Sequence, residues 1–236
     1  MAAMRLAHGA AIRGKRVGSF GEMATFSFFF SHHITTMEGG MLMTNDDRVA
    51  EIARSVRVFG WSRALDDPAA VAARYPDIDP RFLFTHAGYN LRPTEIQGAF
   101  GIHQLPRLDG YLAARNENAR YWIDALRDID GLSIQEVPTH AVHAQFGFPL
   151  VVRPQGLLRR KDLIAALDAR LIETRPVMAG NIAVQPAMKR VNHRVAGDLA
   201  RSRVLHESGF FLGNHHGIGE AQRRYIAETI RGLAGG

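Results

Sequence analysis

Residues 25–40 constrain the fold of this chain more than any other stretch, because an apolar segment is followed there by a polar loop and a glycine pair. The apolar character of Met23 to Phe30 is typical of a strand buried on both faces in a mixed or parallel sheet. The pair Gly39-Gly40 then leads into a second apolar strand, residues 41–43. Since α/β proteins keep their chemistry in loops at strand ends, Ser27 and His32 predict a cofactor pocket.

The composition limits the chemistry that the chain can perform. Its 236 residues are 46% hydrophobic, enough for one large domain or two small ones, and the absence of cysteine excludes disulfides and thiolate-bound metals. The positive charge comes mainly from arginines spread along the chain, which favours small anionic substrates over nucleic acid. Without a membrane-spanning apolar run or a secretory leader, we expect a cytoplasmic protein.

Local patterns predict the elements of the first half. A short hairpin is expected around Gly14-Lys15, and apolar spacing with acidic capping residues predicts a helix from Asp46 to Val58. The stretch from Gly60 to Leu83 has no clear period and is expected to be irregular. A long helical run then begins at Pro93-Thr94-Glu95 and extends to about residue 130, with a break at Pro106.

Beyond Gly131 the pattern changes to short strands that alternate with helices. The predicted strands are Leu132–Val137 and Phe146–Val152, and the predicted helices are Arg160–Arg170, Asp198–Glu207 and Glu220–Arg231. We therefore expect two domains, residues 1–115 as part of a cofactor-binding domain and residues 116–236 as a small α/β domain. The predicted fold class is α/β, with a mixed sheet covered by helices.

The candidate residues also have simpler interpretations. Ser27 suits a phosphate oxygen, but a strand also tolerates a small polar residue. Adjacent side chains diverge on an extended segment, so at most one of His32 and His33 faces a given pocket, and either can be a hydrogen-bonded structural histidine. No His-Glu-x-x-His helix is present, and a metal site is not expected. The nucleophile elbow of serine hydrolases and the glycine-rich nucleotide loops are absent as well.

Eight segments together resemble the DegT/DnrJ/EryC1/StrS family of pyridoxal-phosphate-dependent sugar aminotransferases. They are Ala7-His8-Gly9-Ala10, residues 14–21, Phe26-Ser27-Phe28, Glu38-Gly39-Gly40, residues 88–95, Gln104-Leu105, Thr174-Arg175-Pro176 and residues 210–216. The resemblance implies the aspartate aminotransferase fold, of which this chain would supply the C-terminal portion and a small C-terminal α/β domain.

In most of that family, a lysine five residues after the strand serine binds the cofactor covalently, whereas this chain has His32 there. Its only lysines are Lys15, Lys161 and Lys189. The substitution resembles the nucleotide-sugar 3-dehydratase branch, which implies noncovalent pyridoxamine phosphate and His32 as the catalytic base for loss of the C3 hydroxyl of a 4-keto-6-deoxy nucleotide sugar. Such enzymes serve deoxysugar and lipopolysaccharide synthesis. Imidazole suits proton transfer because its unperturbed pKa of about 6.5 is near operating pH.

The resemblance also assigns roles to other residues. Ser27 is implied to bind the cofactor phosphate, and Asn90 the phosphate bound by a partner subunit, which implies a homodimer. Arg92 is a candidate for a cofactor or substrate phosphate. Arg175 and His215 are candidates for the sugar or the carboxylate of the amino donor, with a surface ion pair or a capping role as the alternative.

Two departures from the family pattern bear on function. The cysteines of the iron-sulfur-dependent dehydratases are missing, which favours recycling of the cofactor by glutamate. The chain also starts where relatives carry the aspartate for the pyridine nitrogen, and Ala3 occupies that position, so we expect an N-terminally truncated pocket. The alternatives are a nucleotide-sugar aminotransferase and a noncatalytic fragment of the family.

Overall fold

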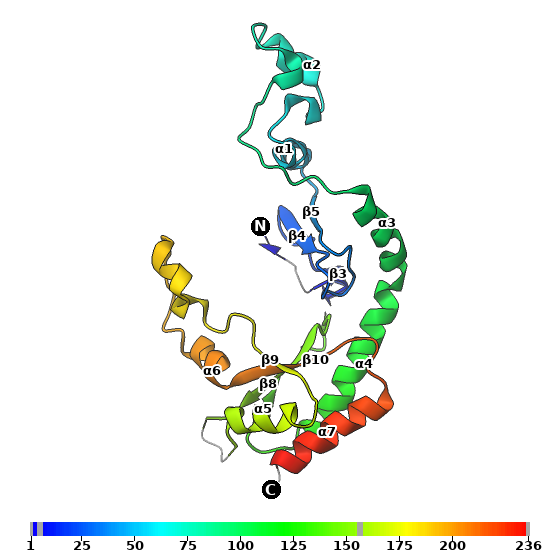
Figure 1. Ribbon diagram of the computed structural model, residues 1–236, viewed down its shortest axis with the longest axis vertical. Coiled ribbons are helices and arrows are strands. Elements are labelled where there is room, and N and C mark those ends of the chain that lie inside the picture. Colours follow the sequence, from blue (N-terminus) through cyan, green and yellow to red (C-terminus); the bar gives the residue numbers. More distant parts are fainter. Residues whose placement is uncertain (1, 4–6, 155–157, 235–236) are drawn as a thin grey trace. The chain divides into compact units, whose positions relative to one another are not determined.

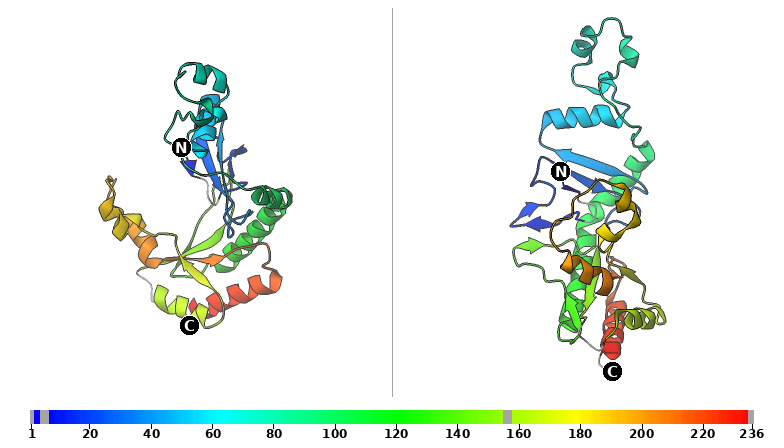
Figure 2. Two further views of the ribbon diagram at one scale, coloured as in Figure 1. Left: turned by 45° about the horizontal axis from the view of Figure 1, so that its top comes forward. Right: turned by 90° about the vertical axis from the view of Figure 1, so that its left-hand side faces the viewer.

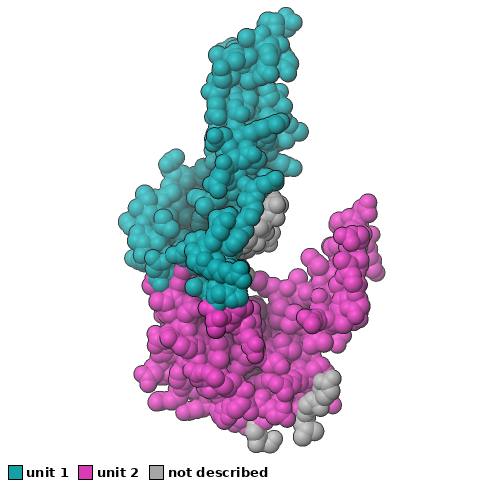
Figure 3. All heavy atoms as spheres, turned by 180° about the vertical axis from the view of Figure 1, so that it is seen from behind, with its two compact units in different colours: residues 1–109, 140–142 teal, residues 110–139, 143–236 magenta. Residues whose placement is uncertain are grey.

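The computed structural model describes residues 2–3, 7–154 and 158–234 (Figure 1). The chain forms two compact units, which Figure 3 distinguishes by colour. Unit 1 comprises Met1–Asp109 with His140–Val142, and unit 2 comprises Gly110–Thr139 with His143–Gly236. The assignment of domains on either side of residue 115 stays a prediction.

Unit 1 contains a mixed sheet of three strands in the order β1-β4-β5. Strand β1 (Ala2–Ala3) runs parallel to β4 (Met23–Ser27), and β5 (Gly40–Thr44) runs antiparallel to β4. In this register Ser27 is opposite Gly40. The mixed sheet and its second apolar strand therefore agree with the sequence-based prediction.

The first apolar strand is shorter and less buried than predicted. It ends at Ser27, and Ala24 is its one buried residue. Phe28 still donates its amide to the Gly39 carbonyl (2.9 Å), after which the amide of His32 donates to the Phe29 carbonyl (3.0 Å) and closes a turn. The prediction that the strand extends to Phe30 was wrong. Residues 28–30 are aromatic, as strand residues often are, but here they enter a turn.

A second small sheet of unit 1 has the order β3-β2-β7. Strands β2 (Ala11–Ile12) and β3 (Lys15–Arg16) form the predicted hairpin, and β7 (Ala141–Val142) pairs with β2. Arg13 and Gly14 both have positive φ, 49° and 75°. This is the backbone that a two-residue hairpin turn requires.

Helix α1 (Asp47–Arg57) confirms the predicted helix. The Asp46 side chain accepts a hydrogen bond from the amide of Val49 (3.0 Å), which satisfies one of the unpaired donors at the start of the helix. The following stretch is less irregular than predicted, because Asp67 and Pro68 start a short helix. Its ordered segments are η1 (Ser62–Ala64), α2 (Pro68–Ala73) and η2 (Pro80–Phe82).

The predicted long helical run is present, with the break at Pro106. It consists of α3 (Glu95–Gln104), η3 (Leu105–Arg107) and α4 (Leu108–Leu126). Thr94 and Gln97 form a capping box at the start of α3, and the amide of Thr94 donates to Gln97 Oε1 (2.7 Å). Pro106 lacks an amide hydrogen, and the helix tightens to a 3₁₀ turn there.

Unit 2 is built on a four-stranded antiparallel sheet in the order β6-β8-β10-β9. Its strands are β6 (Leu132–Ile134), β8 (Gly147–Val152), β9 (Thr174–Pro176) and β10 (Gly209–Gly213). Strand β6 ends three residues earlier than predicted. The pattern of apolar and polar residues did not predict β9 or β10. Both strands are short, and β10 lacks the polar residues that would mark a period of two.

Helices α4, α5 and α7 contribute buried residues to the core of unit 2, and Figure 2 shows α5 and α7 side by side in both views. The helices of this unit after α4 are α5 (Arg160–Asp168), α6 (Ala200–Ser208) and α7 (Glu220–Ala234), with the short turns η4 (Ile182–Val184) and η5 (Pro186–Arg190) between β9 and α6. One buried cluster joins large apolar side chains from four elements: Trp122 of α4, Phe148 and Leu150 of β8, Leu167 of α5 and Ile230 of α7. Burial of these large apolar side chains provides the main stabilisation of the unit.

Candidate functional site

Ser27 and His32, the central pair of the sequence-based site, lie together in unit 1. Ser27 ends β4, and its hydroxyl oxygen accepts a long hydrogen bond from the amide of Phe29 (3.4 Å). The half-buried His32 ring turns back so that Nδ1 lies 3.3 Å from the main-chain oxygen of Ser27. The end of the strand thus orients the imidazole of the loop that follows it.

This contact selects one tautomer of His32. A carbonyl oxygen only accepts hydrogen bonds, so Nδ1 must carry the hydrogen when it bonds to Ser27. The neutral ring then has its lone pair on Nε2, the nitrogen that takes up a proton. The geometry is that of a histidine oriented by a main-chain acceptor, a common arrangement of proton-transferring imidazoles.

Two further histidines are close to His32, one in the same loop and one beside it. His33 and His8 are buried, with 2% and 6% of their surface exposed, and their rings are 5.7 Å apart. His8 also contacts the rings of Phe26 (5.1 Å) and Phe28 (5.6 Å). Burial, with a smaller contribution from His32, lowers the pKa of His8 to about 4. His8 is therefore neutral at physiological pH and places no charge beside the loop.

The loop from Phe28 to Gly39 is tied to helix α3 by two glutamines. Gln104 Oε1 accepts a hydrogen bond from the Thr35 amide (3.3 Å), and Gln97 Nε2 donates to the Glu38 carbonyl (2.8 Å). A Cβ on Gly39 would lie 2.3 Å from Thr36 Oγ1. The loop accepts no side chain there, which explains the glycine.

Asn90 and Arg92, the second predicted pair, lie on an exposed segment that crosses the end of α1. The amides of Tyr89 and Leu91 donate to the carbonyls of Val56 (2.7 Å) and Arg57 (2.9 Å), which lack donor partners within the helix. Arg92 Nε donates to Asn90 Oδ1 (3.1 Å). The helix end therefore fixes the backbone around Asn90, and Asn90 in turn orients the guanidinium.

Close backbone packing holds this segment against α1. A Cβ on Gly60 would lie 1.8 Å from the His86 carbonyl oxygen, and a Cβ on Gly88 would lie 2.1 Å from the Gly60 amide nitrogen. Gly60 also has φ of +82°. Only glycine at both positions allows the two backbone segments to approach this closely.

Arg175 lies in unit 2 on β9, opposite Phe211 of β10. Its guanidinium pairs with Glu173 Oε1 at 2.5 Å, and both side chains are exposed. The structure thus contains the surface ion pair that the sequence left open as the alternative role of Arg175. An incoming anion would have to compete with Glu173.

His215 follows β10, and its ring nitrogen Nδ1 accepts a hydrogen bond from the Gly217 amide (3.1 Å). Partial burial, and then the positive charge of Arg115, lower the pKa of His215. The neutral ring therefore carries its hydrogen on Nε2, where it is a donor. The neighbouring His216 ring stacks on Tyr111 with centroids 3.8 Å apart.

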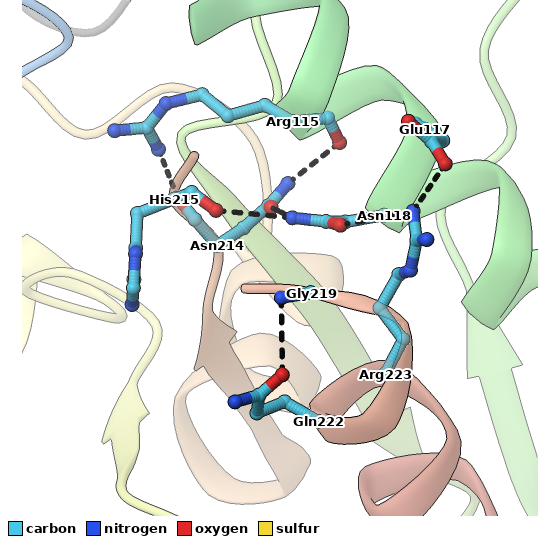
Figure 4. Close-up of polar contacts among 8 residues, drawn as sticks. All are labelled: Arg115, Glu117, Asn118, Asn214, His215, Gly219, Gln222 and Arg223. Carbon is cyan, nitrogen blue, oxygen red and sulfur yellow. Dashed lines mark hydrogen bonds and ion pairs between the residues drawn. The ribbon is translucent and has the colours of Figure 1, made fainter. Parts of the chain in front are cut away.

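A buried polar network beneath His215 was not predicted from the sequence. Arg115, Asn118 and Asn214 converge around the backbone of residues 214 and 215 (Figure 4). One sequence signal was available, because Arg115 and Asn118 recur at helical spacing with Trp122 and therefore belong to the buried face of α4. Polar residues on a core-facing stripe need internal partners.

Two features are absent from the described ranges, 2–3, 7–154 and 158–234. They contain no group of three or more histidine or carboxylate side chains arranged to hold a metal ion. None of their helices combines the length and the apolar character needed to cross a membrane.

A solved structure identifies the class to which this fold belongs. The crystal structure of GDP-4-keto-6-deoxymannose-3-dehydratase with a trapped PLP-glutamate geminal diamine superposes with a TM-score of 0.86 at 33% identity, over 94% of this chain and 58% of the solved chain. The fold is that of the pyridoxal-phosphate-dependent aminotransferases of fold type I. The family model of the DegT/DnrJ/EryC1/StrS aminotransferases matches residues 5–231. The chain belongs to this family, as its sequence motifs predicted.

Curated relatives include sugar dehydratases of two kinds. GDP-4-keto-6-deoxy-D-mannose 3-dehydratase of Escherichia coli O55:H7 is 35% identical over 88% of this chain and 54% of the relative. dTDP-4-dehydro-2,6-dideoxy-D-glucose 3-dehydratase of Saccharopolyspora spinosa is 32% identical over 94% of this chain and 50% of the relative. The chain thus spans about half the length of these relatives.

Proposed function

We propose that this chain carries the catalytic histidine of a pyridoxamine-phosphate-dependent 3-dehydratase that acts on a 4-keto-6-deoxy nucleotide sugar. One observation carries the proposal: an imidazole oriented by Ser27 stands where most of the family has its cofactor-binding lysine. The lysines of the chain belong to β3, α5 and η5, away from the loop of His32 in the sequence. The dehydratase relatives support the same reaction class.

The residues at the end of β4 fit the cofactor. The Ser27 oxygen accepts from the Phe29 amide, an arrangement that leaves its own hydrogen to donate to a phosphate oxygen. The adjoining loop is tied at both glutamines of α3 and would keep this hydroxyl in place. When bound, pyridoxamine phosphate supplies an amine for the sugar ketone and a ring that accepts electrons.

His32 has the role of a proton carrier in this proposal. Its Nδ1 hydrogen bond to Ser27 holds the ring, so that Nε2 takes a proton from the cofactor methylene as the C3 hydroxyl departs. The overall reaction balances if glutamate restores the amine: the sugar loses one oxygen, and glutamate becomes 2-oxoglutarate and ammonia. Glutamate as donor is supported by the PLP-glutamate adduct in the solved relative.

Asn90 and Arg92 are proposed to act in a second copy of the chain. Both side chains are exposed, and the hydrogen bond between them orients the Arg92 guanidinium, a group well suited to phosphate. A homodimer with shared sites would bring this pair to the cofactor phosphate of the other subunit.

Within unit 2, Arg175 and His215 are proposed substrate contacts. A cytoplasmic location stays a prediction from the sequence.

Product analysis tests the proposal. The chain is incubated with pyridoxamine phosphate, glutamate and either GDP-4-keto-6-deoxymannose or a dTDP-4-keto-6-deoxy sugar. We expect a nucleotide sugar one oxygen lighter, with 2-oxoglutarate formed in equal amount. A product that has gained an amino group at C4, together with a borohydride-reducible cofactor adduct on a lysine, would instead indicate an aminotransferase. No cofactor uptake and no turnover, alone or with a full-length relative, would indicate a noncatalytic member.

A further inference from the structure

The network beneath His215 is centred on two buried amides, those of Asn118 on α4 and Asn214 after β10. Their side chains are 0% and 3% exposed. Asn118 Nδ2 donates to Asn214 Oδ1 (3.0 Å), so the two amides contact each other directly although they are 96 residues apart in sequence. They join the helix to the turn that carries His215.

Every amide hydrogen of this pair has an acceptor. The second hydrogen of Asn118 Nδ2 bonds to the His215 carbonyl (3.1 Å), and Asn214 Nδ2 donates to the carbonyls of Arg115 (3.0 Å) and Gln145 (2.9 Å). Because both amide groups are buried and fully hydrogen-bonded, any displacement of the pair would leave a polar group without a partner. The network therefore specifies the path of the backbone at residues 214 and 215.

Two arginines support the pair from either side. The buried Arg115 guanidinium donates to the carbonyls of Asn214 and Phe146. Arg223 of α7 donates to Asn118 Oδ1 (3.4 Å) and pairs with Glu117 (2.6 Å). Four oxygens thus accept hydrogen bonds here. They are the side-chain amide oxygens of Asn118 and Asn214 and the main-chain oxygens of residues 214 and 215.

The His215 side chain is outside this network, and its ring points away from the amide pair (Figure 4). The main chain of His215 is held by Asn118, and its ring by the Gly217 amide at Nδ1. Nε2–H is consequently a donor on an exposed ring whose backbone is rigidly fixed. A donor of this kind suits an oxygen of a phosphate or a sugar hydroxyl.

We propose that Asn118 and Asn214 are positioning residues that hold His215 so that its Nε2–H donates to an oxygen of the nucleotide-sugar substrate. The proposal rests on the proposed function for its ligand, but its structural part concerns only His215 and the amide pair. The two parts are therefore tested by separate measurements.

The first measurement is nitrogen-15 NMR of the histidine rings in the 236-residue chain, compared between wild type and Asn118→Ala or Asn214→Ala. Wild-type His215 is expected to be the Nε2–H tautomer with a pKa below about 6.5. In both variants the pKa should rise toward that value and the tautomer preference should weaken, because the turn moves away from Arg115 and becomes more solvated. An unchanged His215 signal in both variants overturns the proposal.

A matched control is Asn116→Ala, since Asn116 is also on α4 and its Nδ2 donates to two carbonyls, of Leu112 and His143. Neither of these bonds involves residue 214 or 215, so His215 should titrate as in wild type. Asn118→Ser keeps one donor and should give an intermediate shift. This milder variant decides the question if an alanine variant does not fold.

The second measurement is the dissociation constant of the nucleotide sugar. His215→Ala, Asn118→Ala and Asn214→Ala should each raise it by about five- to tenfold, the effect of one lost hydrogen bond. Combining Asn118→Ala with His215→Ala should add less than twofold, because both act through one donor. The positioning role is overturned if the effects of Asn118→Ala and His215→Ala on the dissociation constant are fully additive. It is also overturned if His215→Ala weakens binding but Asn118→Ala and Asn214→Ala do not. Unchanged binding in His215→Ala would show that His215 does not contact the substrate. If the dehydratase reaction alone is not found, the NMR test of His215 and the amide pair still stands by itself.

Discussion

Nδ1 of His32 lies 3.3 Å from the main-chain oxygen of Ser27, so the residue that ends β4 also sets the tautomer of the candidate catalytic base. A hydroxyl for the phosphate and a lone pair for the proton thus come from two residues five positions apart. Gln97 and Gln104 of α3 hold the loop in which this contact forms.

Replacing His32 by Asn should lower the rate of dehydration by about a hundredfold or more, because a positioned general base contributes on the order of 10²–10⁴. The measurement is the steady-state formation of 2-oxoglutarate with saturating cofactor. His193→Asn is the matched control, since His193 Nδ1 also contacts a main-chain carbonyl (Val191, 2.7 Å) but is exposed in the segment before α6. Undiminished turnover in His32→Asn would remove this residue from the mechanism.

Replacing Ser27 by Ala should weaken binding of pyridoxamine phosphate by about 10- to 100-fold, the effect of one hydrogen bond to a charged group. Fluorescence or absorbance titration of the cofactor measures the change. Ser19→Ala serves as the control, because the Ser19 hydroxyl donates to the Arg16 carbonyl (2.7 Å) on the exposed hairpin. Equal affinities in wild type and Ser27→Ala would contradict the phosphate role.

Mixing two inactive variants tests the shared site. If each site uses His32 of one subunit and Asn90 of the other, His32→Asn and Asn90→Ala homodimers should both be inactive, and their exchange should restore about a quarter of wild-type activity. The assay requires subunit exchange, verified by mass spectrometry of the mixed dimers. Verified mixed dimers without activity would show that both residues belong to the same subunit's site.

His8 should make stability depend on pH between about 6.5 and 4. Above pH 6.5 the ring is neutral in both states. Because burial lowers the folded-state pKa from 6.5 to about 4, the unfolded chain binds the extra proton between these values, and the free energy of unfolding falls as the pH falls. Below pH 4 this contribution levels off. The total effect is on the order of 3 kcal/mol.

Urea unfolding at several pH values measures this dependence. His8→Phe keeps an aromatic ring beside Phe26 and Phe28 and should make the fall from pH 6.5 to 4 less steep than in wild type. His193→Phe should leave the slope unchanged, because His193 is exposed. Carboxylates contribute equally to both proteins and cancel in the comparison. Identical slopes for wild type and His8→Phe would count against a neutral buried His8.

Two leucines at the end of α5 offer a matched test of the core of unit 2. Leu167 is 0% exposed in the central cluster, whereas Leu171 is 95% exposed. Leu167→Ala should lower the free energy of unfolding by about 2–5 kcal/mol through lost burial and a cavity. Leu171→Ala should change it by less than about 0.5 kcal/mol. Chemical denaturation of both variants checks the difference.

Local signals in the sequence were sufficient for elements whose causes are local. Asp46 caps α1, Pro106 interrupts the run from α3 to α4, and the turn at Arg13-Gly14 forms the hairpin, each through residues within a few positions. Family motifs also located Ser27 and His32. A missed local signal was the cap of α2, where Asp67 accepts from the Ala70 amide (2.8 Å).

The strand lengths could not be obtained in the same way. Phe28 to Phe30 continue the apolar pattern of β4, yet the chain turns there because Phe28 bonds back to the loop through Gly39 and Thr36. Strand β10 is central in its sheet and was still unpredicted, since its short apolar run has no period of its own. Pairing with β8 and β9 defines it.

The sequence by itself determined the family, the longer helices, and the imidazole in place of a lysine, because each depends on residue identity or on neighbours within one or two turns. The tertiary structure alone decided how Asn118 meets Asn214 across 96 residues, and how Gln104 meets Thr35 in the loop of His32 across 69 residues. Hydrogen bonds between distant residues form only after the core has brought the backbones together. No local pattern encodes that approach.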